Sequence, residues 1–141
     1  MQTKSVMEQF SNQKYLNIET YRRNGEGVRT PVWFVEQDGK LYVRTGSKSG
    51  KAKRIRNFPQ VRIAPCKAQG EVIGEWVKGT ARRVDNQKAK SINPLFSKKY
   101  GLQKLFFDVI GRLQRFETAT YEIILENQPT PSENGVSGMG E

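Results

Sequence analysis

The chain has 141 residues, with 24 Lys or Arg, 14 Asp or Glu and no His. This length suits one domain with a buried core, and the formal net charge of +10 implies a polyanionic partner such as nucleic acid, an acidic membrane surface or a phosphorylated ligand. The absence of histidine excludes Ser-His and Cys-His nucleophile pairs, an imidazole base and a His-ligated metal. The only cysteine, Cys66, allows no internal disulfide, and we interpret it as a small buried hydrophobe.

Two observations concern the setting and the domain organisation. The N-terminus lacks the apolar core of a secretory signal and the apolar runs are too short to span a bilayer, so we expect a cytoplasmic protein with no membrane partner. No repeat or linker divides the chain, which predicts one domain over residues 1–126. Pro, Ser, Gly and Asn then dominate, which predicts a disordered tail over residues 127–141.

Strand patterns fill most of the first 84 residues, after a short helix predicted within residues 1–13. Leu16, Ile18 and Thr20 alternate with polar residues, as a half-buried strand requires, and Asn24-Gly25 predicts a hairpin turn. With the strand at residues 15–21, the same patterns predict strands at residues 28–34, 40–45, 61–64 and 71–84. Strands this close in sequence predict an antiparallel barrel.

Helical patterns follow at residues 86–92 and 102–114, before a last strand at residues 116–125. The second helix has the clearest periodicity in the chain, because its apolar residues recur on one face of a 3.6-residue helix. We therefore predict a packing helix that buries this apolar face. It consists of Leu102, Leu105, Phe106, Val109, Ile110 and Leu113.

The segment between residues 44 and 56 contains six Lys or Arg residues and no acid. Two glycines and two serines in residues 46–51 (GSKSGK) predict a tight turn and a capped helix start, whose free N–H groups form an anion site. A nucleotide-binding P-loop is excluded, because only three residues separate the glycines and Ala52 follows Lys51. The alternative is a basic face that only contacts solvent.

Pro31 interrupts the strand predicted at residues 28–34. Proline has no N–H to donate to a sheet, so this strand lies at an edge or at a bulge, or its backbone faces something other than a strand. The residues alone favour a protected edge. The alternative is a backbone that faces a flat ligand, with Trp33 and Phe34 packed nearby.

Several of these segments share their pattern with a known family. They are residues 30–34 (TPVWF), 41–45 (LYVRT), 49–56 (SGKAKRIR), 59–61 (PQV), 64–66 (APC) and 79–81 (GTA). Together they resemble the split-barrel flavin and deazaflavin oxidoreductases over about residues 14–125. The resemblance is strongest to small members of the pyridoxamine 5'-phosphate oxidase-like superfamily that are classed as deazaflavin-dependent enzymes.

The resemblance implies a mainly β fold with flanking helices, a six-stranded antiparallel split β-barrel. It also implies a homodimer with the cofactor in a groove between the subunits. By position, the backbone around Pro31, Val32 and Trp33 would face the ring system of the cofactor, beside Thr30. The phosphate would be held by Thr45, Ser49, Lys51 and Arg54, with Gly50 and Lys53 in the same site.

We therefore expect an oxidoreductase that transfers hydride between a deazaflavin coenzyme (F-420) or FMN and a small organic substrate. The cofactor carries this chemistry, so no catalytic side chain and no metal is assigned. The surplus of positive charge favours the deazaflavin, whose oligoglutamate tail adds carboxylates. Vitamin B6 oxidation and haem degradation are disfavoured, because the relatives that perform them use a histidine.

Two alternatives remain open. The first is an FMN-binding or cofactor-carrier protein without turnover. The second is a nucleic-acid-binding small barrel, which the net charge and the strand aromatics also fit. It is disfavoured because the cations cluster on one turn and short helix, and the others spread over helices and do not alternate with aromatics on one sheet. These others are Lys88, Lys90, Lys98, Lys99 and Lys104.

Overall fold

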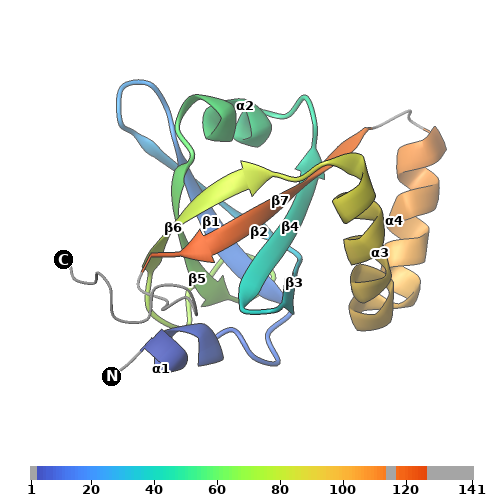
Figure 1. Ribbon diagram of the computed structural model, residues 1–141, viewed down its shortest axis with the longest axis horizontal. Coiled ribbons are helices and arrows are strands. Elements are labelled where there is room, and N and C mark those ends of the chain that lie inside the picture. Colours follow the sequence, from blue (N-terminus) through green and yellow to red (C-terminus); the bar gives the residue numbers. More distant parts are fainter. Residues whose placement is uncertain (1–2, 114–116, 127–141) are drawn as a thin grey trace.

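The computed structural model describes residues 3–113 and 117–126 (Figure 1). The tail predicted over residues 127–141 lies outside the described residues. Within the described part of the chain, no helix combines the length and the hydropathy needed to cross a membrane. In chain order the elements are α1 Thr3–Glu8, β1 Tyr15–Tyr21, β2 Gly27–Val32, β3 Phe34–Gln37, β4 Lys40–Gly46, α2 Gly50–Asn57, β5 Gln60–Cys66, β6 Val77–Arg83, α3 Asn86–Tyr100, α4 Leu102–Leu113 and β7 Thr118–Leu125.

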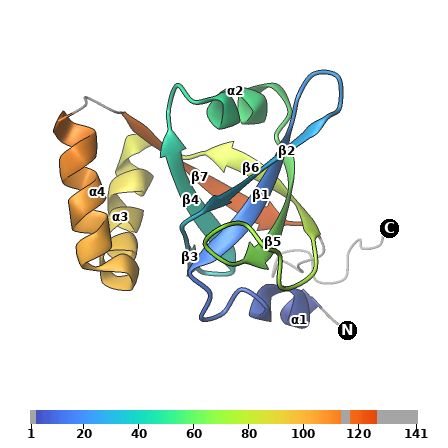
Figure 2. The ribbon, with the colours of Figure 1, turned by 180° about the vertical axis from the view of Figure 1, so that it is seen from behind.

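The strands form one antiparallel sheet that curls into a barrel. Its order is β2-β1-β5-β6-β7-β4-β3, so the two edge strands are consecutive in sequence and only Trp33 separates them. Because consecutive Cα atoms lie about 3.8 Å apart, the two edges must approach each other at this residue. Figures 1 and 2 show α2 over one end of the barrel, α1 near the other, and α3 and α4 side by side along one flank. The predicted mainly β, antiparallel split barrel with flanking helices is confirmed.

The strand count differs from the predicted six, because the strand expected at residues 28–34 is divided at Trp33. Its first part, β2, pairs with β1, whereas its second part, β3, pairs with β4. A chain that changes partner has to leave one ladder before it enters the next, and Trp33 belongs to neither. The barrel therefore has seven strands.

Two buried clusters hold the barrel and its flanking helices. Inward-facing residues of the strands fill the barrel, which explains the alternation seen in the sequence. They include Leu16, Ile18, Leu41, Val43, Ile63 and Ile123. A second cluster packs α3 against the outer face of β3 and β4, and contains Val35, Tyr42, Ile92, Phe96 and Tyr100.

The strand predicted over residues 71–84 is shorter than expected, because only Val77–Arg83 forms β6. The preceding segment is held by Gln9, whose amide both donates to the Glu75 carbonyl and accepts from the Glu75 N–H, each at 2.9 Å. A Cβ atom on Gly74 would lie 2.6 Å from a side-chain atom of Pro65. This close approach leaves no room for a side chain at position 74.

Helix α3 continues to Tyr100, although the sequence predicts its end at Ile92. Pro94 lies inside the helix and lacks the N–H that a helical residue donates. The buried residues Ile92, Phe96 and Tyr100 follow at four-residue spacing and pack on the barrel. Their burial offsets the lost hydrogen bond, so the helix passes through the proline.

Helix α4 forms as predicted, but its apolar face does not pack within one chain. The exposed fractions are 82% for Leu102, 59% for Leu105 and 61% for Phe106. Among residues 102–110 of this helix, the buried residue is instead a cation, Lys104, with 4% exposure, and it forms an ion pair with Asp108. The expectation that the apolar face packs on the protein is therefore wrong for the single chain.

A buried carboxylate, Glu19, connects three strands. It accepts hydrogen bonds from Arg62 at 2.7 Å, Tyr21 at 2.8 Å and Arg29 at 2.9 Å, and both guanidinium groups also flank the ring of Trp76. Burial alone would raise the pKa of Glu19, but the hydrogen bonds from Arg62, Arg29 and Tyr21 outweigh it and lower the pKa to about 2.

Replacing Glu19 with Gln should remove an acid-sensitive component of the folding free energy. A carboxyl group whose pKa in the folded state, about 2, lies below its ordinary 4.5 stabilises the fold above pH 4.5 and loses that contribution as the pH falls towards 2. The parent should therefore lose up to about 3 kcal/mol more than Glu19→Gln between pH 5 and pH 2. Urea unfolding at several pH values measures this difference. Glu26→Gln, at an exposed pair with Arg22, is the control and should follow the parent.

Candidate functional site

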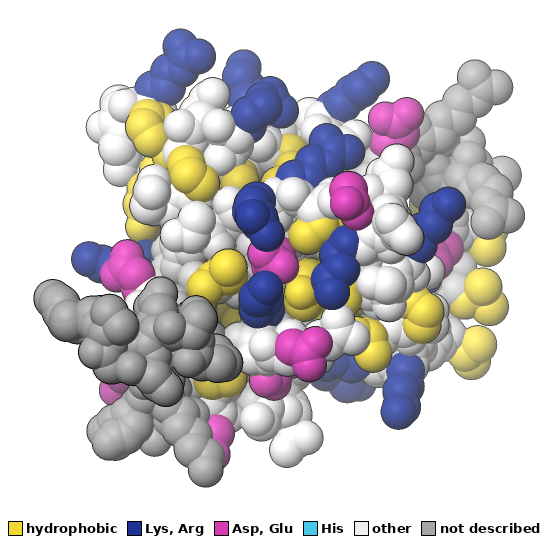
Figure 3. Space-filling model, viewed as in Figure 1, with side chains coloured by type: hydrophobic (Ala, Val, Ile, Leu, Met, Phe, Trp, Pro, Cys, Tyr) yellow, Lys and Arg dark blue, Asp and Glu magenta, His cyan; other side chains and the backbone are white. Residues whose placement is uncertain are grey.

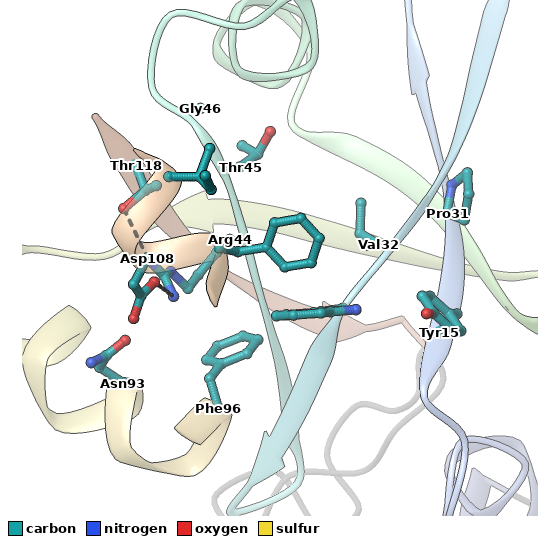
Figure 4. Close-up of a pocket in the computed structure, with 13 residues that line it drawn as sticks. Tyr15, Pro31, Val32, Arg44, Thr45, Gly46, Asn93, Phe96, Asp108 and Thr118 are labelled. Atoms are coloured by element: carbon teal, nitrogen blue, oxygen red, sulfur yellow. Dashed lines mark hydrogen bonds and ion pairs between the residues drawn. The ribbon is translucent and has the colours of Figure 1, made fainter. Parts of the chain in front are cut away.

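A cavity of about 790 Å³ lies between the barrel and the two flank helices. Figure 4 shows one side formed by Tyr15, Pro31 and Val32 of β1 and β2, and Thr45 and Gly46 at the end towards α2. Trp33, Phe107 and Ile110 also line it. The opposite side comes from β4, α3, α4 and β7, and consists of Arg44, Asn93, Phe96, Asp108 and Thr118.

Four of the ten predicted cofactor-binding residues line this cavity: Pro31, Val32, Trp33 and Thr45. The other six are not on its wall. Thr30 lies opposite Ile18 in the pairing of β1 and β2. The remaining five belong to the cap and the first turns of α2, and are Ser49, Gly50, Lys51, Lys53 and Arg54.

The position of Pro31 is compatible with both interpretations of the sequence. β2 is an edge strand, and Pro31 lies opposite Asn17 of β1. The missing N–H therefore leaves no gap in a central ladder. The same residue lines the cavity. Pro31 therefore belongs both to the edge of the sheet and to the candidate ligand-binding surface.

Side chains of α3 hold the chain where β2 changes into β3. The Tyr100 hydroxyl accepts a hydrogen bond from the Phe34 N–H at 2.9 Å, and lies 2.8 Å from the Lys14 carbonyl and 2.9 Å from the Phe34 carbonyl, to which it can donate. The Lys99 ammonium donates to the Phe34 carbonyl at 2.8 Å. Burial raises the pKa of Tyr100 and lowers that of Lys99 to about 8.

The same helix fixes the orientation of Trp33, a wall residue of the cavity. The rings of Trp33 and Tyr100 are stacked with centroids 4.2 Å apart and 8° between their planes. Phe107 of α4 meets Trp33 edge-on, at 5.4 Å and 74°. These two contacts restrict the indole to one orientation.

At the other end of the cavity, the wall residue Thr45 contacts the start of α2. Ser49 is the N-cap of this helix: its hydroxyl accepts from the Ala52 N–H at 3.1 Å and lies 3.3 Å from the hydroxyl of Thr45. The N–H groups of Gly50 and Lys51 belong to the first turn and have no carbonyl partner within the helix. The predicted capped helix start is confirmed, and it joins the cavity through Thr45.

The first turns of α2 gather positive charge without a carboxylate. Burial and the nearby Arg54 lower the pKa of Lys51, which means that its charge is desolvated and repelled. The Arg54 side chain folds back over the helix start, since a Cβ atom on Gly50 would lie 2.9 Å from its Nη1 atom. Among the described residues, no ion pair involves Lys51, Lys53 or Arg54. Such a helix start has the charge and the free N–H groups that suit an anion.

The polar and aromatic residues on the α3 and α4 side of the cavity were not predicted as site residues from the sequence. These helices are far from β2 in sequence, and their packing cannot be deduced from periodicity. The position of Arg44 could have been predicted from the alternation of its strand. Arg44 shares a strand face with Tyr42, opposite to the apolar Leu41 and Val43. An arginine on that face needs a polar surface or a ligand.

Comparisons with known proteins agree on the fold. No protein-family model and no curated protein matches the sequence. Among solved structures, a candidate pyridoxamine 5'-phosphate oxidase from Listeria innocua matches with a TM-score of 0.63 and 12% identity, over 87% of this chain and 92% of the other. The chain has the split-barrel fold.

Two further structures have the same architecture. The haem storage protein HutZ from Vibrio cholerae matches with a TM-score of 0.66 and 17% identity, over 89% of this chain and 92% of the other. An FAD-binding protein from Mesorhizobium loti matches with a TM-score of 0.63 and 14% identity, over 89% and 91% of the two chains. At such low identities the likeness concerns the fold alone.

Tyr100→Phe should destabilise the protein by about 1–3 kcal/mol, because the change removes the hydroxyl that binds the buried Phe34 N–H but keeps the ring stacked on Trp33. Denaturant unfolding measures the effect. Ser91→Ala removes an exposed hydroxyl from the same helix, whose bond is to the Lys88 carbonyl, and should change stability by less than about 0.5 kcal/mol. Equal effects of the two changes would contradict a special role for Tyr100.

Proposed function

We propose that this chain is an oxidoreductase that binds FMN or the deazaflavin coenzyme (F-420) in the cavity and transfers hydride to or from a small organic substrate. One observation carries the proposal. The cavity has aromatic walls, and its wall residue Thr45 contacts Ser49, the cap of a helix start whose cations have no ion-pair partner among the described residues. A planar ring system needs aromatic walls, and the phosphate attached to it needs cations and free N–H groups near one end of the same cavity.

The residues present fit such a cofactor. The cavity volume of about 790 Å³ falls within the range of roughly 300–1,000 Å³ that is typical of cofactor sites. The ring system would lie along Pro31, Val32 and Trp33. The phosphate would accept hydrogen bonds from Thr45, from Ser49 and from the free N–H groups of α2, and charge-assisted bonds from Lys51 and Arg54.

The division of labour follows from what the chain lacks. When bound, the cofactor supplies the hydride chemistry. The protein has no histidine, and burial raises the pKa of its one thiol, Cys66, which keeps this thiol protonated. The described residues would therefore hold and orient the cofactor and exclude water from it. A protein with a free buried thiol fits a cytoplasmic setting.

The charge around α2 favours the deazaflavin coenzyme. After one phosphate has been bound, the exposed side chains of Lys48, Lys53 and Arg56 remain without a carboxylate partner among the described residues. In Figure 3, Lys and Arg side chains gather at the end of the molecule that carries α2. Carboxylates of an oligoglutamate tail could bind there, whereas FMN has none.

We also propose that a second copy of the chain covers α4. A continuous row of exposed large apolar side chains on one helix marks an interaction site, and Figure 3 shows hydrophobic side chains along the edge where α4 lies. The same helix contributes Phe107 and Ile110 to the cavity wall. A second copy packed on α4 by two-fold symmetry would therefore border the cofactor site, as the resemblance to dimeric split barrels implies.

Lys51→Ala and Arg54→Ala should each weaken the binding of FMN and of the deazaflavin coenzyme by roughly ten- to a hundredfold, because each removes a charge-assisted hydrogen bond to the phosphate. Titration followed by the visible absorption of each cofactor measures the affinities. Lys90→Ala, on the exposed surface of α3, should leave them unchanged.

If all three variants lose affinity equally and added salt abolishes the remaining binding, the basic surface binds polyanions diffusely and a nucleic-acid partner is favoured. Binding without any cofactor turnover would identify a carrier protein.

Leu105→Glu should convert a dimer of 16.1 kDa chains into monomers, because it places a charge in the proposed interface. Light scattering at micromolar concentration tests this. The unfolding free energy of the monomer should change little, since Leu105 is already 59% exposed. Gln103→Glu adds the same carboxylate at another exposed position of α4 and is the control. A monomeric parent that binds its cofactor fully would contradict the proposal.

A further inference from the structure

The guanidinium group of Arg44 faces the cavity with few of its hydrogen bonds made. Its Nη2 atom lies 3.5 Å from the Thr118 hydroxyl, and its Nη1 atom lies 3.7 Å from the Asp108 carboxylate. Figure 4 shows these groups together on the side of the cavity opposite Val32. An arginine has five N–H donors, so among the described residues most of them have no acceptor. The side chain is only 24% exposed, so its charge is partly removed from water.

Asp108 does not neutralise Arg44, because it is already the partner of another cation. The Lys104 ammonium binds the Asp108 carboxylate more closely than Arg44 does, and Lys104 is almost fully buried. Arg44, Lys104 and Asp108 together carry one net positive charge. The charge suits a singly charged anion better than a phosphate dianion.

This cationic place is separate from the start of α2. Consecutive residues of a strand point to opposite faces, and here Arg44 reaches Phe96 of α3 and Asp108 of α4, whereas Thr45 reaches Ser49. A cofactor phosphate at α2 therefore leaves Arg44 available to a second molecule. The two cationic groups therefore lie in different places, Arg44 on the α3 and α4 side of the cavity and the others at the start of α2.

Aromatic rings also lie beside Arg44. The ring of Phe96 lies 5.8 Å from its guanidinium carbon, and Trp33 and Phe107 also line the cavity. Aromatic walls favour planar conjugated molecules, and an arginine fork matches the two oxygens of a carboxylate.

We propose that Arg44 binds the carboxylate of a planar aromatic substrate at the α3 and α4 end of the cavity. This inference rests on the proposed function, since it assigns the substrate end of the site whose other end holds the cofactor. Arg44 is then a specificity-determining residue. Asp108 and Lys104 position its guanidinium group.

The test uses 2-naphthoate and its uncharged counterpart 2-naphthamide as probes. Calorimetry measures their binding to the full chain, both free and loaded with FMN. The parent should bind naphthoate at least about tenfold more tightly than naphthamide, because only the carboxylate makes the charge-assisted bonds. Arg44→Gln should remove this preference and leave the affinities for naphthamide and FMN within about twofold. Arg44→Lys keeps the charge without the fork and should show an intermediate preference.

The control is Arg23→Gln, at an exposed arginine in the turn between β1 and β2, which should keep the preference. Thermal unfolding verifies that each variant is folded, and Arg44→Lys carries the test if Arg44→Gln is not. A parent that binds both probes equally would overturn the proposal. So would a loss of FMN affinity in Arg44→Gln as large as its loss of naphthoate affinity, because Arg44 would then bind the cofactor.

The two proposals fail in different ways. If FMN and the deazaflavin coenzyme both fail to bind but the naphthoate preference depends on Arg44, the cofactor assignment is wrong and the carboxylate site stands. If the cofactor binds through Lys51 and Arg54 but naphthoate is not preferred, the carboxylate site alone is wrong.

Discussion

The hydrogen bonds that Tyr100 makes to the backbone at Phe34 are the contact on which the rest of the site depends. The chain must pass there from one edge of the sheet to the other, and edge strands expose backbone groups that need partners. Tyr100 binds the Phe34 N–H, and Lys99 binds the Phe34 carbonyl. Side chains of α3 thus take the place of a neighbouring strand. The same tyrosine ring stacks on Trp33, so the closure of the barrel and the shape of the cavity wall have one cause.

The distribution of charge follows a second constraint. Buried carboxylates in the barrel have cationic partners: Glu19 binds two arginines, and Glu122 accepts from Arg82 at 2.9 Å and lies 3.5 Å from Lys40. These ion pairs offset most of the free-energy cost of burying the carboxylates. The chain has a net charge of +10, so many of its cations have no carboxylate partner. At the start of α2, such cations lie beside helix N–H groups that are not hydrogen-bonded within the helix. The start of α2 therefore carries positive charge with no ion-pair partner among the described residues.

How far the sequence predicts this site depends on the range of the interactions involved. The N-cap at Ser49 and the basic first turn of α2 could be predicted, because a cap and a helix start involve residues three or four positions apart. The division of the predicted strand at Trp33 could not, since it reflects the competition of two ladders for one segment. The continuation of α3 past Pro94 likewise depends on the barrel surface that buries Phe96 and Tyr100.

The sequence by itself determined the strand-rich antiparallel architecture, the absence of histidine chemistry and the capped, basic start of α2, because alternation, composition and helix capping are local properties. Only the tertiary structure decided that Arg44 faces α3 and α4, that these helices close a cavity against β2, and that the apolar face of α4 stays exposed. A periodic pattern states that a helix has an apolar face, but not which surface covers it. That choice depends on contacts between residues as distant as Tyr15 and Thr118, which only the folded chain brings to one cavity.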